Sequence, residues 1–355
     1  MVTSRTQLAR TAGIAAAMLL VLLVAGRFTS AGLGSSEARP PVGKLPPTPT
    51  ETTSPPRSPV ISAVMLRAGR HRLAFGGGSL WVANDNGTVN RIDPRFDHIV
   101  ADTIRVAGED AGLRGAAVGA GAVWVPIANP GALARIDVAT GRVTGTVPLG
   151  RPLREPVGVT ATDDAVWVTC CAFEIAGRPG GKLIRVDPAT GKVTARITLP
   201  EDPLAVAAVP GQVWVATEEG GAIRVDPASN RVAEVLRGGP RGAAQTVAVS
   251  ADGVVWLANP GDGTVIRLDS SAPDQTHAQD LDVATQLAVG PEDIWAVATN
   301  DQVVVRIDRS DGVLTGRFPV SYVRSVQSIA YGAGSVWAVQ GGETLLRLDP
   351  EMVVR

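Results

Sequence analysis

This chain of 355 residues contains few Cys and few aromatic side chains, and its positive and negative charges nearly balance. The two Cys exclude a disulfide-framework protein and a cysteine-rich zinc module. The 33 basic and 34 acidic residues leave a net charge of −1. A charge so close to zero gives no electrostatic footprint for nucleic acid or for an anionic membrane surface. We therefore expect no nucleic acid among the partners.

Turn-forming residues, in contrast, are abundant. The 40 Gly and 26 Pro indicate many turns and argue against a long helical bundle. Only five Phe and two Tyr are present, yet there are seven Trp, an unusual share for the bulkiest side chain. The length suggests two or three domains unless the chain forms one closed all-β unit, because such folds run longer as single domains.

One apolar run near the N-terminus stands apart. Residues 11–26 carry no charge and follow Arg5 and Arg10, the layout of a secretory signal or a signal-anchor. A helix over this run spans roughly 24 Å, short of the ~30 Å hydrocarbon core, and small residues suited to cleavage occur at 29–31. Residues 1–31 are therefore either a cleaved signal peptide or a retained single-pass membrane anchor. Both place the rest of the chain outside the cytoplasm.

Residues 32–58 are rich in Pro, Ser and Thr and contain few apolar side chains. Such a segment cannot bury enough surface to offset its chain entropy, so we predict an extended, disordered linker. A proline-rich ligand for a partner domain is the alternative. The position between an export segment and a folded region favours a stalk.

The rest of the chain, residues 59–355, repeats one pattern seven times. Each copy has a Trp in an apolar run such as SLWVAN or QVWVAT, followed by an Arg-apolar-Asp triplet. The Trp residues recur at intervals of 39 to 47 residues: Trp81, Trp124, Trp167, Trp214, Trp256, Trp295 and Trp337. The triplets begin at Arg91, Arg135, Arg185, Arg224, Arg267, Arg306 and Arg347. Seven ordered copies make the repeat specific.

Each copy divides into four short runs rich in Val and Ile and bounded by Gly, Asn, Asp and Pro, which predicts strands. Four strands per copy in seven copies predict an all-β fold, a seven-bladed β-propeller of four antiparallel strands per blade. A solenoid would need polar capping repeats, and none is visible. The last copy lacks an outer strand, whereas PVISAVMLRAG at 59–69 resembles the outer strand HIVADTIRVAG at 98–108. The N-terminal strand is therefore predicted to complete the last blade and close the ring.

The repeated residues are predicted to be structural. A Trp on the second strand of every blade fills the gap between neighbouring blades rather than forming a row of ligand platforms. Period-2 alternation puts the Arg and Asp of each triplet on one face of its strand. The Asp opens turns such as DPATGK, where its carboxylate accepts turn amides. Seven near-equivalent copies indicate parts of a scaffold rather than seven active sites.

The strands and turns together resemble a known family. WVAN followed by V-x-RIDP-x-TGKV resembles the seven-bladed YVTN/YncE-type propellers and is similar to the propeller of streptogramin B lyases, over residues 59–355. The motif is specific for fold rather than for activity, because unrelated functions share such folds. The resemblance to the lyases implies a divalent metal and a His and a Glu near the central channel. That pair does not map onto this chain, in which WVAN-like strands replace the Trp-Phe-Thr-Glu strand of the lyases.

Ten or eleven positions before each Trp, the chain enters the innermost strand of a blade, which lines the channel of a propeller. Polar side chains at or next to these positions are predicted to bind a ligand at the channel mouth: His71, Arg72, Arg114, Gln245, Gln286 and Gln327. A polar, water-filled channel without a ligand is the alternative. A lone histidine near the axis is a poor basis for metal binding or acid–base catalysis, which needs a positioned partner.

Loops on the same variable face add possible carboxylates, with solvated loop acids as the alternative: Glu155, Asp202, Glu218 and Glu219. The third copy departs most from the pattern, because a longer loop separates Trp167 from Arg185. That loop holds the adjacent Cys170 and Cys171, which in an exported protein form either a vicinal disulfide or two free thiols. The chain lacks the CxxC spacing that would indicate a metal or redox site.

Two classes of function follow from these observations. We favour a non-catalytic binding or scaffold module at the cell envelope, monomeric, without cofactor or metal, whose partner is a cell-envelope protein or a small molecule. The alternative is a metal-dependent lyase or lactonase-type enzyme with its site in the central channel. The missing His/Glu pair favours the first class. A carboxylate such as Glu155 or Glu218 within hydrogen-bond reach of His71 would favour the second.

Overall fold

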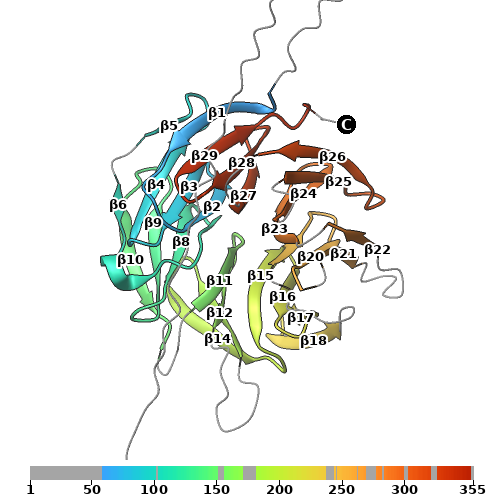
Figure 1. Cartoon of the computed structure of the whole chain (residues 1–355). Helices are drawn as coiled ribbons and strands as arrows, with labels where there is room; N and C mark the ends of the chain where they lie inside the picture. Colours follow the sequence, from blue (N-terminus) through green and yellow to red (C-terminus); the bar gives the residue numbers. More distant parts are fainter. Residues whose placement is uncertain are drawn as a thin grey trace, which may run out of the picture. The chain divides into compact units, whose positions relative to one another are not determined.

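The chain folds into a ring of seven antiparallel β-sheets, as the repeat predicts (Figure 1). The computed structural model describes residues 58–100, 103–150, 156–170, 181–236, 244, 246–261, 263–268, 277–281, 284–299, 303–320 and 326–352. Six sheets have four strands each, and in the seventh the outer strand is split in two. The prediction of a seven-bladed β-propeller is confirmed. Residues 1–57, with the predicted export segment and most of the linker, lie outside the described residues.

Each blade runs from an innermost strand at the axis to an outer strand at the rim. Blade 1 comprises β2 (His71–Gly76), β3 (Ser79–Asn84), β4 (Thr88–Asp93) and the pieces β5 (His98–Ile99) and β6 (Ile104–Arg105). Blade 2 comprises β7 (Ala117–Gly119), β8 (Ala122–Ile127), β9 (Ala132–Asp137) and β10 (Val143–Pro148). Blade 3 comprises β11 (Pro156–Ala161), β12 (Val166–Cys170), β13 (Lys182–Asp187) and β14 (Lys192–Thr198). Blade 4 comprises β15 (Pro203–Val209), β16 (Gln212–Thr217), β17 (Ala222–Asp226) and β18 (Arg231–Leu236).

Blades 5 to 7 follow the same order. Blade 5 comprises β19 (Thr246–Val249), β20 (Val255–Asn259), β21 (Thr264–Leu268) and β22 (His277–Asp280). Blade 6 comprises β23 (Ala284–Val289), β24 (Asp293–Ala298), β25 (Val303–Asp308) and β26 (Leu314–Pro319). Blade 7 comprises β27 (Val326–Gly332), β28 (Ser335–Gln340), β29 (Thr344–Leu348) and β1 (Val60–Met65). Helical structure among the described residues is confined to a 3₁₀ turn, η1 (Glu109–Ala111), and no described helix is long and apolar enough to cross a membrane.

The ring closes through β1, the strand that precedes all others in the sequence. β1 pairs antiparallel with β29, from Val60 opposite Leu348 to Met65 opposite Thr344 (Figure 1). The pairing extends beyond β1, because the backbone N–H of Leu66 donates to the carbonyl of Glu343 at 2.7 Å. The predicted closure by the N-terminal segment is therefore confirmed, and β29 is not left as an exposed edge.

The outer strand of blade 1 differs from the single run expected over residues 98–108. β5 pairs Ile99 with Ile92, and β6 pairs Ile104 with Val89. Three steps along β4 thus correspond to five along the outer strand, so the outer strand holds two more residues than β4 can pair. β5 and β6 therefore pair with β4 as two separate strands in place of one continuous outer strand.

Seven apolar clusters fill the seams between successive blades. All seven Trp side chains are fully buried, and each packs into the following blade. Trp81 of blade 1, for example, clusters with Val123 and Val125 of blade 2, and Trp337 of blade 7 clusters with Leu80 and Val82 of blade 1. The large ring fills the wedge that opens between two twisted sheets. The structural interpretation of the repeated Trp is therefore the one that the packing supports.

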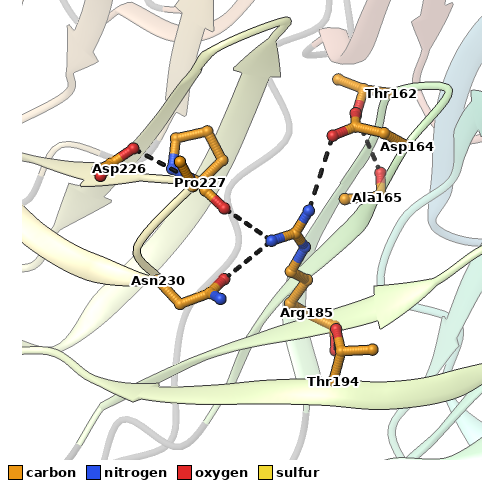
Figure 2. A network of polar contacts seen from close by, with 9 residues as sticks. Thr162, Asp164, Ala165, Arg185, Thr194, Asp226, Pro227 and Asn230 are labelled. Carbon is orange, nitrogen blue, oxygen red and sulfur yellow. Dashed lines mark hydrogen bonds and ion pairs between the residues drawn. The ribbon is translucent and has the colours of Figure 1, made fainter.

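In three of the triplets, the Arg joins its own blade to the next one. Figure 2 shows Arg185 of β13, whose Nη1 donates to the carbonyl of Pro227 at 2.7 Å and to Asn230 Oδ1 at 3.1 Å, both in the outer turn of blade 4. Its Nη2 lies 3.7 Å from the carboxylate of Asp164. The guanidinium also lies over the ring of Trp167, 5.1 Å from the centroid. The side chain of Arg185 thus contacts Trp167 of its own blade and the outer turn of blade 4.

The same link crosses the closing seam. Nη1 of Arg347 in blade 7 donates to the carbonyl of Pro94 at 2.7 Å and to Asp97 Oδ1 at 2.9 Å in blade 1. Between blades 6 and 7, Arg306 Nη1 reaches the carbonyl of Pro350 at 3.4 Å. Arg185, Arg306 and Arg347 therefore link neighbouring blades at the ends of their third strands.

Candidate functional site

The innermost strands of all seven blades surround one cavity on the axis of the ring, with a volume of about 470 Å³. Both arginines predicted at the channel mouth, Arg72 and Arg114, lie in its lining, together with Gln286, Thr246 and Ser328. The remaining lining residues are Gly, Ala, Val, Leu and Ile. The polar part of the described lining is therefore made of cations, amides and hydroxyls, without Asp, Glu or His.

A second cavity of about 290 Å³ lies beside the first, between blades 1, 6 and 7. Arg72 and Gln286 line both cavities, and Arg70 and Gln327 join them in the second. Oε1 of Gln327 is buried and accepts no hydrogen bond from the residues that the structure describes. We call the two cavities together the channel mouth. It contains an acceptor without a partner beside a group of cations.

Arg72 is a half-buried charge of the channel mouth. Burial lowers the pKa of its guanidinium, and the positive charges of Arg70 and Arg114 lower that pKa further. Asp85 is the carboxylate that opposes this effect. Arg72 Nη1 donates to the carbonyl of His71 at 3.1 Å, which holds the side chain in place. Three guanidinium groups thus share one electrostatic environment, in which an added negative charge is stabilised.

Hydroxyl groups fix the wall of the channel mouth on the side of blades 5 and 6. Thr246 Oγ1 donates to the carbonyl of Thr285 at 2.9 Å, and the hydroxyls of Thr285 and Thr299 lie 3.0 Å apart. Between blades 7 and 1, the backbone N–H of Leu73 donates to Ser328 Oγ at 3.1 Å. These bonds hold innermost strands of adjacent blades in register around the arginines.

His71 does not face the axial cavity. Its ring is buried, with Nδ1 2.6 Å from Asn84 Oδ1 and Nε2 2.9 Å from the carbonyl of Arg67. Nε2 also lies 3.1 Å from the carbonyl of Gly342 in blade 7. Both ring nitrogens are therefore engaged by an amide and two carbonyls rather than by a carboxylate. These contacts tie the closing strand to blade 1.

The predicted carboxylates do not gather at the axis in the described part of the chain. Glu218 and Glu219 are exposed. Asp202 is half-buried, and its backbone carbonyl accepts from the N–H of Glu218 at 2.9 Å. Gln245 and Glu155 lie outside the described residues. The structure describes no group of three or more His, Cys, Asp or Glu that is close enough to hold a metal ion.

The cysteine pair is described at one of its two members. Cys170 ends β12 and is buried in the apolar cluster between blades 2 and 3. Cys171 lies outside the described residues, so the choice between a vicinal disulfide and two thiols stays open.

Sequence reasoning missed two members of the channel mouth, Arg70 and Thr299. A signal existed for Arg70, because it lies two residues before Arg72 and period-2 alternation puts both on one face of an extended chain. Thr299 follows the end of β24, and nothing in the sequence associates it with the axis.

Comparisons with known proteins identify the fold. No family model and no curated protein matches the chain. Among solved structures, a hydrazine synthase of Kuenenia stuttgartiensis matches with a TM-score of 0.66 and 15% identity, over 80% of this chain and 97% of that chain. A streptogramin B lyase matches with 0.66 and 17%, over 81% and 98%. A catalytically inactive virginiamycin B lyase from Staphylococcus aureus, solved with quinupristin, matches with 0.66 and 14%, over 81% and 99%. The chain is thus similar in fold to the streptogramin B lyase propeller.

Proposed function

We propose that this protein is a binding module of the cell envelope that captures an anionic ligand at the channel mouth. The observation that carries the proposal is the group of Arg72, Arg70 and Arg114, whose positive charges act on one another in a partly buried setting. The apolar run at 11–26 and the linker at 32–58 support a location outside the cytoplasm. The propeller acts there as a non-catalytic scaffold whose axis holds the ligand.

A carboxylate, phosphate or sulfate suits this arrangement for two reasons. Guanidinium groups present paired N–H donors that match the two oxygens of such anions. A negative charge beside Arg72 also relieves the repulsion that lowers its pKa. Gln286 adds an amide donor to the same lining. The buried Oε1 of Gln327 accepts from a ligand N–H or O–H, so the preferred ligand carries a donor beside its anionic group.

Citrate, which combines carboxylates with one hydroxyl, serves as the probe, and calorimetric titration of the purified protein is the measurement. We expect saturable binding that weakens as salt is added. The variant Arg72→Gln should bind citrate at least about tenfold more weakly, a loss of about 1.4 kcal/mol. The control Arg231→Gln removes an exposed guanidinium on β18, remote from the axis, and should leave the affinity unchanged. No saturable citrate binding, or an equal loss in both variants, would contradict the proposal.

The alternative is a metal-dependent lyase or lactonase-type activity in the channel, which the likeness in fold to the streptogramin B lyase propeller favours. The described lining does not fit a divalent cation, because it offers guanidinium groups, amides and hydroxyls in place of carboxylates and imidazoles. We therefore derive no catalytic step. Metal analysis of the purified protein and melting curves with and without added Mg²⁺ or Mn²⁺ test this alternative. Bound metal together with a metal-dependent rise in melting temperature would support the enzyme.

A further inference from the structure

One position of the repeat changes character in blade 1. The residue directly before the triplet Arg lies on the third strand and faces a seam. Its identities in blades 2 to 7 are apolar: Ala134, Ile184, Ile223, Ile266, Val305 and Leu346. Blade 1 has Asn90 there, opposite Val82 across the strand pair. The seam between blades 7 and 1 therefore has an amide where the six other seams have an apolar side chain.

A pocket of about 350 Å³ lies at that point. Asn90, Asn86 and Thr88 line it from blade 1, and Met65 lines it from the end of β1. Ile99 of β5 and Arg105 of β6 also line it, so the pocket lies beside both pieces of the outer strand. We call this cavity the seam pocket.

The polar floor of the seam pocket is a connected network. Asn84 Nδ2 donates to Asn90 Oδ1 at 2.8 Å and to Thr88 Oγ1 at 2.9 Å, and Thr88 Oγ1 donates to Asn86 Oδ1 at 2.6 Å. Nδ1 of His71 lies 2.6 Å from Asn84 Oδ1 and fixes the orientation of the Asn84 amide. These bonds occupy the amide oxygens of Asn86 and Asn90. Their Nδ2 groups have no acceptor among the described residues, so four N–H bonds remain for a ligand at the pocket.

Charge and apolar surface complete the pocket. Arg67 and Arg105 belong to its lining. Glu109 is the counter-charge, 3.8 Å from Arg105, with both side chains largely exposed, so the pair contributes little to stability and leaves Arg105 available. Met65 is 69% exposed and Ile99 is 38% exposed, which provides an apolar wall next to the donors. The pocket combines amide donors, two cations and a small apolar surface.

We propose that the seam pocket binds a small monocarboxylate with an apolar tail, at a site separate from the channel mouth. The carboxylate lies against the amides of Asn86 and Asn90 and near the two arginines, and the tail contacts Met65 and Ile99. Hydrogen bonds from neutral amides together with nearby cations favour a carboxylate over a neutral group of the same shape. The proposal does not depend on the channel mouth binding anything.

Hexanoate is the probe, and hexanamide is its neutral counterpart of nearly equal size. Binding to the purified full chain is measured by calorimetric titration. We expect saturable hexanoate binding and at least about tenfold weaker hexanamide binding. Absence of saturable hexanoate binding up to about 10 mM, the weak end of specific affinities, would overturn the proposal. Equal binding of the two probes would overturn the assignment of a carboxylate site.

Three variants locate the site. Asn90→Ile introduces the residue that blades 3, 4 and 5 have at this position and should weaken hexanoate binding at least about tenfold. Arg105→Gln changes an exposed side chain and should give a similar loss, which keeps the test decisive if the Ile variant folds poorly. Arg231→Gln, on β18 and outside the seam pocket and the channel mouth, should leave hexanoate binding unchanged. Full hexanoate binding in both seam variants would overturn the proposal.

Discussion

At the scale of single residues, the outer turns explain why two blades tolerate a strained backbone. Gly191 and Gly312 end their turns with φ of 66° and 76°, in the left-handed region. Asn230 and Asp97 occupy the equivalent position with φ of 53°. Their side chains accept hydrogen bonds from the Arg of the preceding blade. The link between blades thus offsets a conformation that costs a residue with a Cβ about 1–2 kcal/mol.

The first prediction separates the link from the strain. Asn230→Ala keeps the strained φ and removes the acceptor of Arg185, so it should lower the free energy of unfolding by about 1–2 kcal/mol. Asn230→Gly removes the acceptor but relieves the strain, and should cost less. Gly191→Ala is the control for strain alone, because an added Cβ there meets only Val147, at an ordinary 3.5 Å. Urea unfolding measures all three variants. An alanine variant as stable as the glycine variant would contradict the account.

Residues of the scaffold were more predictable than their contacts. The sequence predicts that the Asp of each triplet accepts hydrogen bonds from turn amides, and Asp187 accepts from the N–H groups of Ala189 and Thr190. Pro227 and Asn230, which accept hydrogen bonds from Arg185, lie in another blade, about one repeat further along the chain. Strand periodicity describes one strand at a time, so it contains no information on that contact.

At the scale of elements, the closing strand was predictable and the broken one was not. The likeness of residues 59–69 to an outer strand, with a missing outer strand in the last copy, identifies β1. The same likeness predicts one continuous run at 98–108, where the structure has β5 and β6. The break depends on how many residues of β4 are available for pairing, which is a property of two strands together.

The second prediction concerns β1. Deleting residues 59–67 removes the partner of β29 and exposes apolar side chains of the closing seam, among them Leu345 and Trp337. We expect the propeller to open or unfold, with loss of the cooperative melting transition. Deleting residues 34–42 of the predicted linker is the length-matched control and should leave the melting temperature unchanged. An unaltered melting temperature after loss of 59–67 would contradict closure by this strand.

At the scale of the whole molecule, the Asp carboxylates of the repeated turns are expected to lose their charge together as the pH falls. The side-chain hydrogen bond from Arg95 lowers the pKa of Asp93 to about 2. Hydrogen bonds from turn residues likewise lower the pKa of further triplet carboxylates: Asp137, Asp187, Asp226 and Asp308. A carboxylate whose pKa is lower in the folded state stabilises the fold above its ordinary pKa. That stability is lost as the pH falls toward the folded-state value.

The third prediction is therefore a fall in melting temperature between about pH 4 and pH 2, as these carboxylates are protonated together. Asp187→Asn should be less stable than the parent at neutral pH. The difference should shrink as the pH approaches 2, because the parent carboxylate then loses its charge as well. Melting curves across this range measure both effects. A difference that stays constant with pH would show that the charge of Asp187 does not stabilise the turn.

The position of the candidate site was also a property of the whole ring. Counting back from each Trp places Arg72, Arg114 and Gln286 on innermost strands, and they lie in the lining of the axial cavity. His71 fits the same count but faces the closing seam, because strand alternation turns it away from Arg72. Ligand identity depends on how side chains from seven separate copies combine across the axis, and no single copy of the repeat contains that information.

Ring closure has a consequence for the order of events in biosynthesis. β1 is made before any other strand of the propeller, and its partner β29 is made after all the others. The first strand therefore stays unpaired while the ribosome completes six blades, and the nascent ring keeps an open edge throughout that time. Long-range pairing of this kind makes closure a late and slow folding step. A chaperone that shields β1 and the unfinished seam during that interval would act on the step that completes the fold.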